Sequence, residues 1–145
     1  MLQAMNTGHD GSLSTAHANS ARHLLWRLET MALMSDVVLP VAHVREQVAS
    51  AIDVVVHMAR LRDGRRLVFQ VATVDGLQDG EPVVTEVFGF RPRLGPAGSF
   101  TCGGSVPALV ETLRERGTSV SEDIFAPGID VSGIGSSGNE ARDAG

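Results

Sequence analysis

The sequence predicts an α/β fold in which an antiparallel β-meander is flanked by helices. Three β-favouring segments, residues 52–61, 67–74 and 83–90, follow one another along the chain with Asp-Gly pairs in the turns between them. Apolar residues recur at helical spacing before this region and again after it. Segments joined by such short turns pair as antiparallel neighbours, so we expect one sheet with helices packed against it.

Two helices are expected before the meander and one after it. Asn19-Ser20 is a favourable N-cap for an amphipathic helix of about 14 residues. Pro40 can open the next helix at its first turn. After the meander, residues 106–116 carry apolar side chains on one face, and Gly117 ends that helix.

Two short strands and a tail complete the expected organisation. Residues 12–18, which follow the Asp10-Gly11 turn signal, are expected to form a buried strand, and residues 99–102 can add another. From about Pro127 the sequence is rich in glycine and serine. We therefore expect one domain over residues 1–125 and a disordered tail over residues 126–145.

The composition is typical of a globular protein and argues against several other classes of protein. The chain has 145 residues, 43% hydrophobic and 20% charged, as in a globular domain. A net charge of −5 and only 4% aromatic residues argue against a nucleic-acid partner. The single cysteine, Cys102, excludes an intrachain disulfide and fits a reducing compartment. No apolar run is long enough for a membrane helix, so membrane contact is expected only through a partner.

The most chemically distinctive residues lie near the start of the chain. Gly8 and Gly11 flank His9, which lets the backbone pass close to a ligand or to another chain. His17 ends the expected strand, and ligands of open α/β sheets bind beyond the carboxyl ends of strands. An imidazole there can donate a hydrogen bond to a phosphate oxygen. A metal site, which usually takes three or four ligands close in sequence, and a capped turn with two surface histidines remain alternatives.

Four stretches resemble a known family: "TGHDGSLSTAHANS", "RLETMALM", "LPVAHVREQVASAIDVVVHMARLRDGRR" and "EVFGFR". They are similar to the secretion-superfamily ATPases of type II and type IV secretion systems, nearest to the Flp (Tad, CpaF-like) pilus-assembly branch. The resemblance extends from residue 1 to about residue 125. It implies the C-terminal part of a RecA-like P-loop ATPase core, with an incomplete sheet.

The resemblance also implies roles for individual residues. Gly8, Gly11, Thr15 and both histidines fall on the family's His box, which lies beside the γ-phosphate of ATP. His17 would be the γ-phosphate sensor, and His9 would organise the loop or the neighbouring interface. The family forms hexameric rings that hydrolyse ATP with Mg²⁺. These rings are cytoplasmic and meet the inner face of the membrane through a secretion platform protein.

Arg60 and Arg62 match the family's "RLRDG" stretch. Two interpretations of these arginines stay open. They can belong to a solvated turn, or they can contact a neighbouring subunit or its nucleotide.

The sequence also lacks residues that this family needs. A Walker A loop, G-x-x-x-x-G-K-[ST], holds the phosphates of ATP with its backbone amides and its lysine, and no lysine here follows such a loop. The Walker B strand and the aspartate box would precede the His box. We therefore expect a C-terminal fragment that is not catalytic alone. The alternative is a non-enzymatic interaction module, or an inert remnant, that associates with full-length subunits; no metal site is expected.

Overall fold

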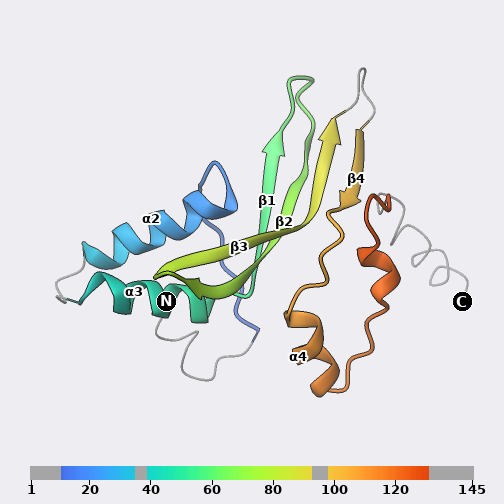
Figure 1. Ribbon diagram of the computed structural model, residues 1–145. Coiled ribbons are helices and arrows are strands. Elements are labelled where there is room, and N and C mark those ends of the chain that lie inside the picture. Colours follow the sequence, from blue (N-terminus) through green and yellow to red (C-terminus); the bar gives the residue numbers. More distant parts are fainter. Residues whose placement is uncertain (1–10, 35–38, 93–97, 131–145) are drawn as a thin grey trace, which may run out of the picture.

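The computed structural model describes residues 11–34, 39–92 and 98–130 (Figure 1). Within these residues, two helices precede a four-stranded sheet, and a short helix and one 3₁₀ turn follow it. The elements in chain order are α2 (Ala21–Leu33), α3 (Val41–Ala51), β1 (Val54–Arg60), β2 (Arg66–Gln78), β3 (Glu81–Pro92), β4 (Gly98–Cys102), α4 (Leu109–Glu115) and η1 (Glu122–Phe125). The predicted combination of flanking helices with a β-meander is confirmed.

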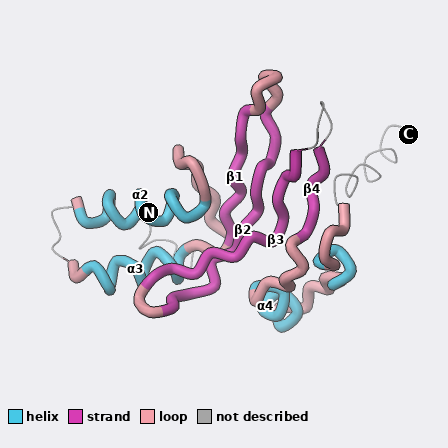
Figure 2. The backbone as a smooth tube through the Cα atoms, turned by 45° about the horizontal axis from the view of Figure 1, so that its top comes forward, coloured by secondary structure: helices cyan, strands magenta, loops and turns pink. Residues whose placement is uncertain are grey.

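The sheet has the strand order β1-β2-β3-β4, and every neighbouring pair is antiparallel (Figure 2). The short strand that residues 99–102 predicted is therefore present as β4. β2 and β3 are longer than expected because Asp79 and Gly80 join them directly. Both residues have positive φ, 52° and 78°, as a two-residue type I′ hairpin turn requires.

A bulge near Gly76 bends the β2–β3 hairpin. The pairing register shifts between Val74 and Leu77, and Gly76 has a φ of 84°, a conformation that glycine adopts without steric cost. Beyond the bulge, the turn end of the hairpin curves beneath the sheet and lies against α3 (Figures 1 and 2). Arg45 on α3 donates to Glu81 of β3 at 2.5 Å and to Glu29 of α2 at 3.1 Å, so one guanidinium links three elements.

Helices α2 and α3 cover one face of the sheet. The Ser20 side chain accepts a hydrogen bond from the backbone amide of His23 at 3.2 Å, which caps α2 as predicted. Pro40 stands at the start of α3, also as predicted. The buried side chains that hold these elements together form two adjoining clusters: Leu25, Leu28, Val44 and Val48, and then Ala21, Val55 and Ala72.

On the other face of the sheet, α4 and η1 pack against β3 and β4. Phe88 is the Cα partner of Val71, so their side chains lie on the same face of the sheet. Successive side chains of a strand alternate between the two faces, and the next residue, Ala72, faces α2. Phe88 therefore points to the side opposite α2. The buried cluster on that side comprises Val87, Cys102, Val110 and Phe125. The sheet therefore separates two apolar layers.

The outer edge of β4 is occupied by the residues after η1. The backbone amide of Cys102 donates to Ile129 O at 3.2 Å, and the amide of Gly128 donates to Cys102 O at 3.0 Å. An isolated antiparallel bridge joins Thr101 to Asp130. The rest of the expected tail, residues 131–145, lies outside the described residues, so the tail remains a prediction.

The expectation of a buried strand over residues 12–18 is wrong. No strand forms there, and the Leu13 side chain is 99% exposed. Each strand of the described sheet pairs with its chain neighbour, and none lies alongside this segment. A short run of small residues is not stabilised as a β-strand when it has neither a partner strand nor a buried face. Among the described helices, none combines the length and the apolar character needed to cross a bilayer.

Candidate functional site

The predicted site begins in the segment that leads into α2. Gly8 and His9 lie outside the residues that the structure describes. Gly11 stands in a turn with a φ of 82°, which favours glycine. Thr15 and His17 are both exposed. His17 lies three residues before the Ser20 cap. Because its side chain is exposed, the imidazole is accessible to a ligand or to another chain.

The second part of the predicted site is the β1–β2 hairpin. Arg60 is the last residue of β1, and Arg62 lies in the turn. The backbone amide of Leu61 donates to Arg65 O at 2.8 Å, and the amide of Gly64 donates to Leu61 O at 3.0 Å. These bonds close a tight turn that presents both arginines to solvent.

Asp63 stabilises this turn. Its carboxylate accepts hydrogen bonds from the backbone amide of Arg65 at 3.0 Å and from Arg65 Nε at 2.8 Å. The backbone bond, followed by the guanidinium, lowers the pKa of Asp63 below the ordinary value for an aspartate. The carboxylate is therefore ionised at neutral pH and engages Arg65, not Arg60 or Arg62.

Among the described residues, the two parts of the predicted site line neither of the two cavities described below. The hairpin tip projects beyond α2 and beyond the blue segment that precedes it (Figures 1 and 2). The two cavities described next are lined by neither His17 nor the two arginines.

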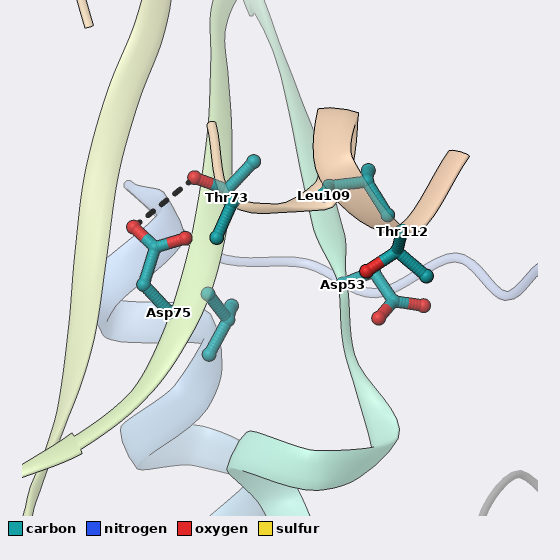
Figure 3. Close-up of a pocket in the computed structure, with 7 residues that line it drawn as sticks. Asp53, Thr73, Asp75, Leu109 and Thr112 are labelled. Atoms are coloured by element: carbon teal, nitrogen blue, oxygen red, sulfur yellow. Dashed lines mark hydrogen bonds between the residues drawn. The ribbon is translucent and has the colours of Figure 1, made fainter. Parts of the chain in front are cut away.

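A cavity of about 260 Å³ lies between the sheet and α4 (Figure 3). Its polar lining consists of Asp53, which precedes β1, Thr73 and Asp75 of β2, and Thr112 of α4. Thr73 is buried, and its hydroxyl donates to Asp75 Oδ2 at 3.3 Å. Figure 3 shows Asp75 turned toward Thr73, with Asp53 close to Thr112 on the other side. A wider groove lies between α3 and the Gly76 bulge, and its lining includes His43, Glu46 and Leu77.

This cavity was not predicted from the sequence. The only available signals were an aspartate at the helix-to-strand junction and the polar residues Thr73 and Asp75 inside an apolar strand. The cavity offers carboxylates and hydroxyls as hydrogen-bonding groups. Across the described ranges, no three histidine, cysteine, aspartate or glutamate side chains are grouped to hold a metal ion. The cavity is thus a recess in which two carboxylates and two hydroxyls lie beside the apolar side chains of Val74 and Leu109.

Comparison with known proteins places these residues in a family. The family model "Type II/IV secretion system protein" matches residues 1–84, which is more than half of the chain. The match includes every site residue predicted from the sequence, from Gly8 to Arg62. It ends before "EVFGFR", earlier than the expected limit near residue 125.

Curated relatives agree with this match. A protein of Mycobacterium tuberculosis named "Putative conjugal transfer protein" is 36% identical over 74 residues, which are 51% of this chain and 20% of that protein. Conjugal transfer protein TrbB of Rhizobium radiobacter is 34% identical over 79 residues, which are 54% of this chain and 23% of that protein. The chain thus spans about a fifth of the length of these relatives. On the strength of the family match, the chain belongs to the type II/IV secretion system protein family.

Proposed function

We propose that this chain is part of the ATPase motor of a type II/IV secretion or Flp-type pilus-assembly system. The observation that carries the proposal is the family match over residues 1–84, which contains the whole predicted His box. In this proposal, ATP hydrolysis by a hexameric ring drives pilus assembly or protein export. The ring works in the cytoplasm, and an inner-membrane platform protein is its partner.

The residues of this chain fit a phosphate-sensing role better than a phosphate-holding one. His17 is exposed and can donate a hydrogen bond to a γ-phosphate at a subunit boundary. Gly8, Gly11 and Thr15 would shape that loop, and His9 would organise it. All 12 basic residues of the chain are arginines, so no P-loop lysine is available. ATP and Mg²⁺ therefore need ligands from another stretch of polypeptide, and we derive no hydrolytic step from this chain alone.

The open edge of β1 supports a larger, RecA-like sheet. Val54, Val55 and Val56 are consecutive apolar residues, a pattern typical of strands covered on both faces. Only Val55 is buried, whereas Val56 and Met58 are 56% and 62% exposed. β1 is also an end strand of the sheet, and its outer edge has no strand beside it among the described residues. A further strand and a covering layer would account for both features.

The motor proposal is tested by grafting residues 11–84 into the matching region of the Mycobacterium relative. We expect this chimera to hydrolyse ATP and His17→Ala to lower its kcat by at least about tenfold, because a transition-state hydrogen bond is lost. The matched control is His23→Ala, whose ring contacts Trp26 on the exposed side of α2. We also expect the unmodified 145-residue chain to release no phosphate from ATP above the buffer blank. Full activity of the His17→Ala chimera, or turnover by the chain alone, would contradict the proposal.

A second candidate function is that of a non-enzymatic module that binds full-length subunits. The exposed apolar side chains on β1 favour it, because apolar patches beside an open strand edge are typical of protein interfaces. We expect the chain to co-elute with a full-length family member and Val56→Lys to abolish co-elution. Val41→Lys, at a similarly exposed apolar position on α3, is the control. If the unmodified chain does not associate, this candidate is wrong.

A further inference from the structure

Three arginines at the β1–β2 hairpin take part in none of the ion pairs between described residues. In the described part of the chain, Arg45, Arg91 and Arg114 each pair with glutamates, and Arg65 pairs with Asp63. None of the ion pairs includes Arg60, Arg62 or Arg66, and all three side chains are exposed. The hairpin therefore carries positive charge that no acidic side chain among the described residues neutralises through an ion pair.

The register places two of these charges directly against each other. Arg60 of β1 is the Cα partner of Arg66 of β2, so both side chains leave the same face of the hairpin. Directly opposed residues have Cβ atoms about 5 Å apart, and like charges at that spacing repel each other. A ligand with several negative charges would remove this repulsion.

The turn leaves room for the guanidinium groups to gather. Gly64 has a φ of 89°, and Arg60 Nη2 lies 3.7 Å from the position where a Cβ on Gly64 would stand. The Arg60 side chain thus folds back over the turn, toward the loop that carries Arg62. Guanidinium groups bind phosphate oxygens through paired N–H donors, which makes arginine well suited to phosphate.

The charge of the hairpin is opposite to that of the molecule. Residues 60–66 contain four arginines and one aspartate, a formal charge of +3. The whole chain has −5, so the remainder carries −8. The net charge of the remainder is negative, so the field of the molecule favours a multiply charged anion at the hairpin tip over most of the other surface.

We propose that Arg60, Arg62 and Arg66 form a binding site for multiply charged phosphate groups. The phosphate belongs either to a soluble polyphosphate, such as a nucleoside triphosphate, or to a lipid headgroup. The exposed Val56 and Met58 lie on the same face of β1 as Arg60 and offer apolar surface beside the phosphate. The proposal depends on the hairpin and not on the motor role. The binding experiments below test the hairpin, whereas the ATPase chimera tests the motor role.

The experiment titrates the whole chain with inorganic triphosphate by calorimetry and, separately, sediments it with phosphatidylglycerol vesicles. We expect saturable binding in at least one arm, weaker as NaCl rises from about 50 to 300 mM. The triple variant R60Q/R62Q/R66Q is expected to weaken that binding by about tenfold or more. Saturation by triphosphate identifies a soluble ligand, whereas binding to vesicles alone identifies a lipid headgroup; either outcome supports the site.

The matched control is R22Q/R27Q on α2, because Arg22 and Arg27 are also exposed and take part in none of the ion pairs between described residues. We expect this variant to bind within about twofold of the unmodified chain. The triple variant removes a like-charge pair and should keep the far-UV circular dichroism spectrum of the unmodified chain. Absence of binding in both arms, or equal losses in the two variants, would overturn the proposal.

Discussion

Leu25→Ala is expected to lower the free energy of unfolding by about 2–5 kcal/mol. Leu25 is 2% exposed and lies in the cluster that joins α2 to Val44 and Val48 of α3. Truncation removes buried apolar surface and leaves a cavity that the surrounding helices and sheet fill only in part. The only tryptophan, Trp26, is the next residue on α2, so its fluorescence in urea measures this loss directly.

Leu33→Ala is the matched control for that experiment. Leu33 is also on α2, but it is among the exposed large hydrophobic residues. We expect its truncation to cost less than about 1 kcal/mol, as is usual for surface positions. Equal effects of the two substitutions would show that the α2–α3 layer does not pack as described.

Phe125→Ala is expected to cost about 3–5 kcal/mol on the other face of the sheet. Phe125 is 6% exposed, and its ring stacks on Phe88 with centroids 5.8 Å apart. Its carbonyl also accepts a hydrogen bond from the buried Cys102 thiol at 3.3 Å. Loss of the ring removes the main apolar contact that holds η1 on the sheet, which circular dichroism in urea should register as earlier loss of the strand signal.

Val106→Ala serves as the comparison for Phe125→Ala. Val106 precedes α4 on the same side of the sheet and is exposed. Its truncation should change the urea midpoint only slightly. A small effect of Phe125→Ala would mean that α4 and η1 contribute little to the stability of the sheet.

Local sequence signals predicted the elements whose causes are local. Ser20 caps α2 because its hydroxyl reaches an amide three residues away, and Asp79-Gly80 forms a hairpin because both residues adopt positive φ. Gly117 ends α4 with a φ of 83°, again as expected. These interactions span a few residues, so the sequence alone contains them.

Long-range features were not predictable in the same way. Whether residues 12–18 form a strand depends on a neighbouring strand, and the isolated sequence gives no information on whether one lies alongside. The bulge near Gly76 depends on the pairing of β2 with β3. The cavity between Asp53, Thr73 and Thr112 arises because α4 packs against strands that precede it by more than 30 residues.

The candidate site also combines features that local sequence predicts with features that depend on long-range pairing. The position of Arg60 and Arg62 at an exposed turn followed from the Asp63-Gly64 pair and the family resemblance. The contribution of Arg66 did not, because it emerges only when the register places Arg66 opposite Arg60. The roles of Gly8, His9, Gly11, Thr15 and His17 remain predictions.

The pairing of residues 128–130 with β4 leaves the sheet with unequal sides. Among the described residues, the chain itself pairs with the outer edge of β4 at Thr101 and Cys102, whereas no strand lies along the outer edge of β1. Two copies that join through β1 would occupy this edge in both molecules, so strand addition through β1 would give a pair and would not propagate into a fibre.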